Sequence, residues 1–139
     1  MAILIDGTVL APGHAEGVAL VSGEPLSFWG GYDAATGKII DQAHPLSGER
    51  AAGRVLVLPF SRGSSTGTAV LLEAIRRGTA PAAIVVGGRD IFFPLAAIVA
   101  QQLYGRSVPV VAIPIASIED IQTGDRLVIG DDGHIRSER

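Results

Sequence analysis

Hydrophobic positions follow two different patterns along the chain. In the first part, short apolar runs such as Ile3–Ile5 and Gly17–Ser22 are interrupted by glycine and proline, which is typical of short strands joined by turns. From Arg54 to Ile113, uniformly apolar runs alternate with segments of helical spacing, and this alternation predicts parallel β-α-β packing. The segment from Arg126 to Ile135 returns to the strand pattern.

The stretch VLVLPF-SRGSST-GTAVLLEAIRRG, residues 55–78, predicts a buried strand, a tight turn and a helix. Val55–Leu58 is an apolar run ended by Pro59, and apolar residues recur at helical spacing from Thr68 to Ile75. Gly78 stands where a glycine ends a helix. The turn therefore places its hydroxyl groups at the positive end of a helix dipole, which is an anion-binding geometry.

The SRGSST turn carries more hydroxyl groups than a helix cap needs: Ser61, Ser64, Ser65 and Thr66. A simple capped helix is the alternative interpretation. A nucleotide-binding P-loop is not expected, because that motif needs a lysine directly before its hydroxyl residue and this turn has none.

A second strand–helix–strand unit follows. Ala82–Val86 is predicted as a buried strand, a helix containing Pro94 runs to about Tyr104, and Val108–Ile113 is the next strand. Arg62 and Arg89 follow successive parallel strands, so both turns are expected at the ligand-binding edge of the sheet. A guanidinium group there would suit a carboxylate substrate, although an isolated arginine at the surface is the common alternative.

Three aromatic residues stand beside two glycines in SFWGGYDAATGKIID: Phe28, Trp29 and Tyr32. We expect a mixture of core anchoring and exposed surface from them. Asp33–Gly37 is predicted as a turn leading into Lys38–Asp41. The last three residues, Ser137–Arg139, are expected to fray.

The composition narrows the function classes. With 139 residues the chain is expected to form one domain, and its hydrophobic content of 47% favours a partner surface. A net charge of −3 without a basic stripe argues against nucleic acid as a partner. The beginning of the sequence lacks a signal-peptide pattern and no apolar run reaches transmembrane length, so a cytoplasmic protein without a membrane partner is expected.

No metal site is expected on this chain. It contains no cysteine, so it can supply no thiolate to a zinc site or iron–sulfur cluster. His14 and His44 lack metal-ligand spacing. His44, next to Pro45, is predicted to be a hydrogen-bonded loop histidine and not a catalytic one.

Several segments together resemble one family. They are PLSFWGGYDAATGKIID, HPLSGERAAGRVLVLP, RGSST and GTAPAAIVVGGRDIFFPLAAIVAQQLYG. In these the chain resembles the small subunit of aconitase X enzymes, which are relatives of aconitase and isopropylmalate isomerase. The resemblance implies an α/β fold over residues 1–139, a swivelling β/β/α domain with open-barrel outer strands around a βαβαβ core. It also implies a large-subunit partner that carries an iron or iron–sulfur centre.

The resemblance assigns site residues in the RGSST turn. The corresponding turn of aconitase-type enzymes reads GSSR, in which the first serine is the base and the arginine binds substrate. Ser64 then takes the role of base, with substrate binding by neighbouring residues: Arg62, Gly63, Ser65 and Thr66. Thr66 replaces the motif's arginine, so the carboxylate clamp must come from elsewhere, with Arg62 and the large subunit as candidates.

The implied activity is that of a hydro-lyase that is active only with its large subunit. Family members dehydrate a small hydroxy acid, either cis-3-hydroxy-L-proline or mevalonate 5-phosphate. Lys38 is the single lysine against ten arginines, and the chain is rich in alanine and glycine, which favours a GC-rich bacterium and hence the hydroxyproline enzyme.

Two alternatives belong to other function classes. Swivelling domains also occur as phosphohistidine carriers, but neither His14 nor His44 lies beside a Ser or Thr in a glycine-rich loop. A free-standing protein that binds an anion at the RGSST turn is the second alternative.

Overall fold

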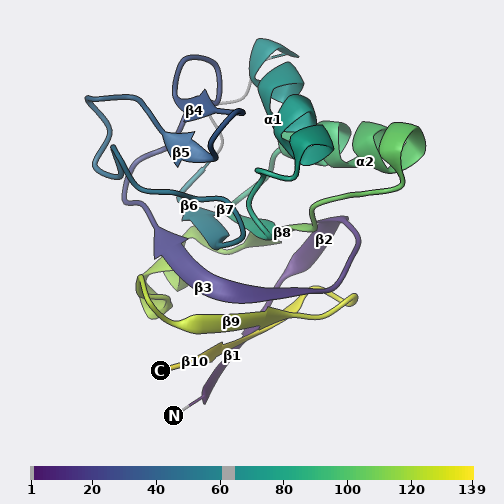
Figure 1. Cartoon of the computed structure of the whole chain (residues 1–139). Helices are drawn as coiled ribbons and strands as arrows, with labels where there is room; N and C mark the ends of the chain where they lie inside the picture. The colour runs from purple at the N-terminus through teal and green to yellow at the C-terminus, as the bar shows by residue number, and fades with distance from the viewer. Residues whose placement is uncertain (1, 61–64) are drawn as a thin grey trace.

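The computed structural model of the chain describes residues 2–60 and 65–139. In chain order, its elements are β1 (Ala2–Asp6), β2 (Thr8–Ala11), β3 (Ala15–Val21), β4 (Tyr32–Asp33), β5 (Lys38–Ile39), β6 (Val55–Leu58), α1 (Ser65–Arg77), β7 (Ala83–Gly87), α2 (Phe92–Tyr104), β8 (Val110–Ile113), the 3₁₀ helix η1 (Ile115–Asp120), β9 (Arg126–Ile129) and β10 (His134–Glu138). Figure 1 shows α1 and α2 above a curved sheet, with β1, β9 and β10 on the side away from the helices. Neither helix within the described ranges has the length and apolarity to cross a bilayer.

The large sheet has the strand order β1-β10-β9-β3-β6-β7-β8-β2. Neighbours among β3, β6, β7 and β8 are parallel, and the other pairs are antiparallel. β1 and β2 stand at opposite ends of this order although only Gly7 separates them in the chain. The sheet therefore curls until its ends meet, which confirms the predicted α/β class and the open barrel around a βαβαβ core.

Gly7 makes this closure possible. Its N–H donates to the carbonyl oxygen of Gly133, in the β9–β10 turn, at 3.1 Å. A Cβ atom at position 7 would overlap Cγ1 of Val111 and lie 2.6 Å from the Gly133 oxygen. Because no side chain fits there, the chain can pass from one end of the sheet to the other within one residue.

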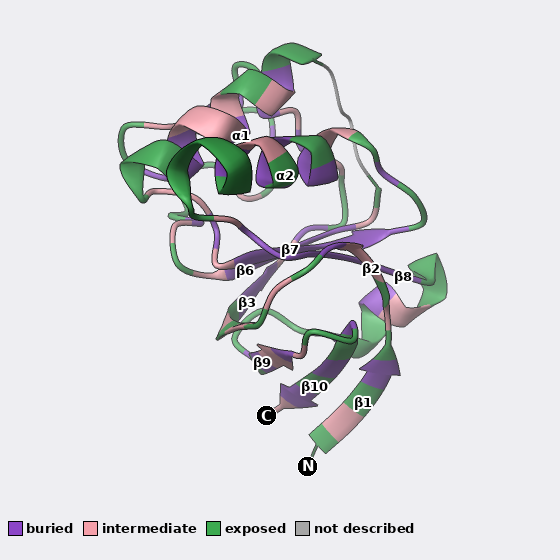
Figure 2. Cartoon of the chain, turned by 90° about the vertical axis from the view of Figure 1, so that its right-hand side faces the viewer, coloured by how far each residue is buried: buried purple, intermediate pink, exposed green. Residues whose placement is uncertain are grey.

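The strands β6, β7 and β8 are buried on both faces. On β6, Val55 and Val57 pack in a core inside the barrel, together with side chains from β1, β9 and β10. Leu56 and Leu58 pack in a second core, between the sheet and the two helices. Burial on both faces explains why the sequence of these strands is uniformly apolar instead of alternating. Figure 2 shows this buried layer between the helices and the lower strands.

The helices α1 and α2 lie side by side on one face of the parallel strands (Figures 1 and 2). Both end at a glycine with left-handed backbone, Gly78 with φ +77° and Gly105 with φ +65°. The N–H of Gly105 donates to the carbonyl oxygen of Gln101 at 3.1 Å. Both predicted helix ends are thereby confirmed.

The connection between β3 and β6 is anchored by aromatic residues. The rings of Phe28 and Tyr32 stack with centroids 4.6 Å apart, and Phe28 meets Phe93 of α2 edge to face at 5.2 Å. Trp29, by contrast, is exposed. The predicted mixture of core anchoring and exposed surface is confirmed.

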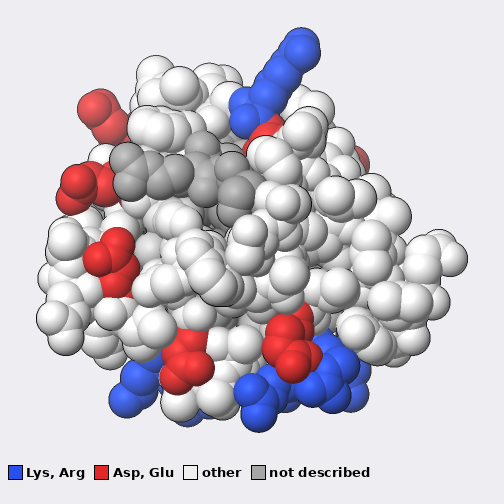
Figure 3. Space-filling view, turned by 90° about the horizontal axis from the view of Figure 1, so that it is seen from above, with Lys and Arg blue, Asp and Glu red and all other residues white. Residues whose placement is uncertain are grey.

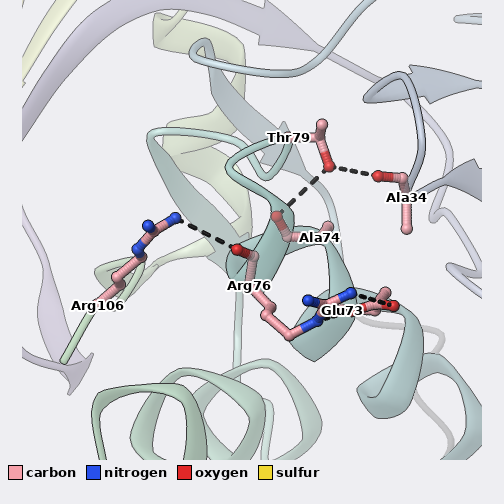
Figure 4. A network of polar contacts seen from close by, with 6 residues as sticks. All are labelled: Ala34, Glu73, Ala74, Arg76, Thr79 and Arg106. Atoms are coloured by element: carbon pink, nitrogen blue, oxygen red, sulfur yellow. Dashed lines mark hydrogen bonds and ion pairs between the residues drawn. The ribbon is translucent and has the colours of Figure 1, made fainter. Parts of the chain in front are cut away.

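Polar contacts fasten the same connection to the far end of α1 (Figure 4). The hydroxyl of Thr79 donates to the carbonyl oxygen of Ala34 at 2.6 Å. Arg106, which follows α2, donates to the carbonyl oxygen of Arg76 at 3.3 Å, and the Arg76 side chain pairs with Glu73. These groups lie where α1 ends, toward the amino ends of the parallel strands.

Three details differ from the expectations. The strand β2 and the helix η1 had no recognised pattern in the sequence. The predicted fraying of the last three residues is wrong. Ser137 is 1% exposed and donates to Asp125 at 3.1 Å, and Glu138 pairs with Ala2 and Arg126. The tail is ordered because β10 is the strand that links β1 to β9.

Gly7→Ala is expected to lower the free energy of unfolding by about 1–3 kcal/mol, because the methyl group must displace Val111 or break the contact with Gly133. Gly23→Ala is the matched control, since a Cβ there meets nothing within 4 Å, and its effect is expected to stay within about 0.5 kcal/mol. Urea unfolding of both variants measures the difference. Equal stabilities would contradict closure of the barrel at Gly7.

Candidate functional site

One edge of the sheet collects the connections that leave the parallel strands. The carboxyl ends of β3, β6, β7 and β8 lie along this edge because these strands are parallel neighbours. Ligands bind at this edge in open α/β sheets. The connections begin at Ser22, Pro59, Gly88 and Pro114. The SRGSST turn belongs to the connection that follows β6.

The structure describes part of the predicted site. Three of the predicted site residues lie outside the described residues: Arg62, Gly63 and Ser64. Their roles stay predictions. Ser65 and Thr66 are described, and they are the first two residues of α1 and are exposed. The helix begins, as predicted, with hydroxyl residues at the carboxyl edge of the sheet.

The connections after β6, β7 and β8 touch one another at Gly87. A Cβ atom on Gly87 would overlap the carbonyl oxygen of Pro59 and lie 3.0 Å from Cγ1 of Ile115. The starts of the two helices also meet, because the hydroxyl of Thr68 lies 3.5 Å from the carbonyl oxygen of Phe92. The three connections are therefore packed together at this edge, and the start of α2 lies against the first turn of α1.

Asp90, which follows β7, has a structural role. Its carboxylate oxygens accept the N–H groups of Phe92 at 3.2 Å and Phe93 at 2.9 Å, and the side chain is buried. Asp90 therefore caps the start of α2, and its negative charge faces the positive end of that helix. The sequence analysis listed no such role for it.

Arg89, the residue before Asp90, is exposed. It has no hydrogen-bond or ion-pair partner within residues 2–60 and 65–139. It lines a shallow depression of about 300 Å³, together with residues from the β1–β2 junction and the end of β8: Asp6, Thr8, Gly88, Ala112, Ile113 and Pro114. A cationic group is thus presented at the edge where the sequence predicted one.

His44 braces the neighbouring connection after β3. It is 8% exposed, and its Nδ1 accepts the N–H of Leu46 at 3.1 Å. Because Nδ1 uses its lone pair there, the neutral ring carries its proton on Nε2, which lies 3.4 Å from the hydroxyl of Ser22. Ser22 in turn donates to the carbonyl oxygen of Glu24 at 2.6 Å. The prediction of a hydrogen-bonded loop histidine is confirmed.

The edge also carries three large apolar side chains that the sequence analysis missed. Phe60, Ile91 and Ile115 follow β6, β7 and β8, and they are 50%, 72% and 59% exposed. Their signal in the sequence is an apolar residue two to four positions after a strand, where turns usually carry polar residues. Such an apolar rim around polar groups is typical of a surface that another chain covers.

The described ranges contain no group of three or more His, Asp or Glu side chains that could hold a metal ion. The sequence contains no cysteine. These residues do not fit an iron–sulfur cluster or a zinc site.

A barrel-like sheet with two helices over its parallel half defines the class of swivel-type α/β domains. Residues 4–137 match the sequence model of the family described as aconitase X swivel domain, and the chain belongs to this family.

Relatives include two kinds of dehydratase. A cis-3-hydroxy-L-proline dehydratase of Pseudomonas aeruginosa is 47% identical over 110 residues, which cover 79% of this chain and 19% of that protein. The phosphomevalonate dehydratase small subunit of Methanothermobacter thermautotrophicus is 38% identical over 136 residues, which cover 95% of this chain and 98% of that one. The chain thus spans about a fifth of the hydroxyproline dehydratases it matches.

A solved structure gives the same fold. The crystal structure of holo-form aconitase X from Thermococcus kodakaraensis matches with a TM-score of 0.87 at 29% identity, over 99% of both chains. The solution structure of a UPF0107 protein matches with a TM-score of 0.82 at 34% identity and covers 96% of this chain and 97% of that one.

Proposed function

We propose that this chain is the small subunit of a two-subunit dehydratase of the aconitase X type, which is active only together with a larger chain. The observation that carries the proposal is the hydroxyl-rich turn before α1, at the carboxyl edge of a swivel domain whose relatives are named as dehydratases or dehydratase subunits. The substrate is a small hydroxy acid, and the reaction removes water from it.

In this reaction Ser64 takes the proton from the carbon beside the carboxylate of the substrate. The electrons of the broken C–H bond form the new C=C bond, and the hydroxyl group on the next carbon leaves with its electron pair and becomes water on protonation. A serine alkoxide needs stabilisation by its surroundings. The start of α1 supports this role, because its first turn contains no acidic residue to neutralise the positive end of the helix dipole.

Arg62, Gly63, Ser65 and Thr66 bind the substrate beside Ser64 in this proposal. Ser65 and Thr66 are exposed in the first turn of α1, within reach of an anionic group that approaches the start of the helix.

We favour cis-3-hydroxy-L-proline as the substrate. Its dehydration gives Δ1-pyrroline-2-carboxylate after tautomerisation. Support comes from the arginine-rich composition and from the 47% identity over 110 residues to the Pseudomonas aeruginosa enzyme. Identity to the archaeal small subunits ranges on either side of this value, with 38% over 136 residues for Methanothermobacter thermautotrophicus and 56% over 71 residues for Methanopyrus kandleri. Mevalonate 5-phosphate, which would give trans-anhydromevalonate phosphate, is the second candidate because several small subunits of that enzyme are related to the chain.

The iron or iron–sulfur centre of the enzyme belongs to the larger chain in this proposal. The chain itself supplies no cysteine. Its contribution to the reaction is therefore limited to binding the substrate, to moving the proton and to covering the site.

The other function classes are less well supported. A phosphohistidine carrier needs an accessible histidine beside a Ser or Thr. His44 is buried with both ring nitrogens beside a hydrogen-bonding partner, and the exposed His14 has no Ser or Thr next to it in the sequence. A non-catalytic module that binds an anion at the RGSST turn would use the same geometry without a larger chain.

The surface for the larger chain is the outward face of α2 together with the apolar rim. Ile91, Leu95 and Ile98 lie at helical spacing and are exposed, and no charged residue lies between Phe92 and Tyr104. Figure 3, seen from the helix side, shows a broad area without charged side chains. The larger chain is the proposed occupant because the matched segment is only 19% of the hydroxyproline dehydratases, so most of such an enzyme lies outside this domain.

Ser64→Ala in the two-chain complex is expected to lower kcat by about 10²- to 10⁴-fold, because the group that accepts the proton is lost. Ser47→Ala, an exposed serine in the connection between β5 and β6, is the matched control and should leave kcat unchanged. Both variants should bind the larger chain normally in size-exclusion chromatography. Near-normal turnover by the Ser64 variant would remove this residue from the role of base.

A double variant Leu95→Asp/Ile98→Asp is expected to weaken binding of the larger chain at least about 100-fold, because two carboxylates would be buried without partners. Leu4→Asp is the control, since Leu4 is exposed on β1, away from the helices. Calorimetric titration measures both affinities, with circular dichroism to check folding. Equal affinities for the two variants would contradict docking through α2.

A further inference from the structure

We propose that Arg89 binds the carboxylate group of the substrate. The proposal rests on the proposed dehydratase function and deepens it. The resemblance places Thr66 where the GSSR turn has its arginine, so another group has to bind the carboxylate. Both candidate substrates carry a carboxylate next to the carbon that loses its proton. A guanidinium group binds a carboxylate through two parallel hydrogen bonds, which fixes the orientation of that carbon.

The position of Arg89 follows from the packing of the connections. Arg89 stands two residues after Gly87, where the carbonyl oxygen of Pro59 occupies the space of a Cβ atom. Pro59 begins the connection between β6 and α1, so this connection and the one that carries Arg89 leave neighbouring parallel strands at one edge. The depression of about 300 Å³ beside Arg89 leaves room for a small ligand at this edge.

Most other arginines are used by the fold. Five pair with a carboxylate and one donates to a backbone carbonyl: Arg54, Arg76, Arg126, Arg136, Arg139 and Arg106. Arg50 and Arg77 also lack such a contact within the described ranges, but Arg50 precedes β6 and Arg77 ends α1. Among the described arginines, Arg89 is therefore the one that is both unpaired and placed at the carboxyl edge.

The acidic residues near Arg89 have other partners. Both carboxylate oxygens of Asp90 accept backbone N–H groups of α2. Asp6, which lines the same depression, lies 3.0 Å from Nε2 of His134. The charge of Arg89 is thus available to a ligand. An unpaired arginine at the surface is ordinary. Arg89 is unusual because its two acidic neighbours, Asp6 and Asp90, already have other partners.

The apolar rim strengthens such a contact. Phe60, Ile91 and Ile115 surround the edge with large exposed side chains. When the larger chain covers them, water is excluded and the attraction between guanidinium and carboxylate grows because the local dielectric constant falls. The same contact in open solution would be weak.

The test compares a substrate with its carboxamide in the complex with the larger chain. Wild type should prefer the carboxylate in kcat/KM, and Arg89→Gln should raise KM for the carboxylate about 10- to 100-fold. In Arg89→Gln, the ratio of kcat/KM for the carboxylate to kcat/KM for the carboxamide should fall toward one. A purely structural role for Arg89 would not change this ratio. Arg89→Lys should restore the preference in part, because it keeps the charge but not the two-pronged geometry.

Arg77→Gln is the matched control, since it removes another arginine without an ion pair, at the end of α1 and away from the carboxyl edge of the sheet. It should leave KM for the carboxylate and the preference over the carboxamide unchanged. Thermal unfolding checks that Arg89→Gln folds normally. If the variant keeps both its KM and its preference for the carboxylate, the assignment of Arg89 is wrong while the dehydratase function stands. If the wild-type complex dehydrates no hydroxy acid, the proposed function itself is wrong, and the assignment of Arg89 falls with it.

Discussion

The burial of β6, β7 and β8 on both faces is the constraint on which the rest of the structure depends. Every residue of these strands is buried, with side chains alternating between the barrel core and the helix-covered core. Polar chemistry is therefore confined to the ends of the strands. The amino ends are closed by structural contacts such as the hydrogen bond between Thr79 and Ala34. The carboxyl ends carry the hydroxyl-rich turn, a free cation and an apolar rim.

Polar groups at the carboxyl edge divide into two sets. Asp90 caps α2, and the pair of His44 and Ser22 braces the connection after β3, so these groups fix the backbone. Ser65, Thr66 and Arg89 are exposed, and Arg89 has no hydrogen-bond or ion-pair partner among the described residues. The buried polar groups therefore hold the backbone, whereas the exposed ones are accessible to a ligand. It fits a half-site that becomes complete only when a second chain covers the apolar rim, which is the proposed arrangement.

Local patterns in the sequence predicted much of the fold. Predictions that rest on a local signal are confirmed. Continuous burial marks the strand Val55–Leu58, and a glycine cap marks the ends of the two helices at Gly78 and Gly105. The strand β2 and the ordered tail could not be predicted in this way, since both depend on pairing between segments far apart in the chain. The site could be predicted as an edge with hydroxyl and guanidinium groups, because these residues follow the strands in sequence. That Asp90 caps α2 and that Arg89 has no partner among the described residues depends on the three-dimensional packing, which no local pattern reveals.

Turnover by the reconstituted pair of chains tests the proposed division of the site most directly. This chain, the larger chain and the anaerobically prepared complex would each be offered cis-3-hydroxy-L-proline and mevalonate 5-phosphate. We expect dehydration of one of the two acids by the complex, and little or none by either chain alone. Full activity of the larger chain by itself would contradict the proposal that the swivel domain completes the site. A well-formed, metal-loaded complex that dehydrates neither acid would contradict both proposed substrates.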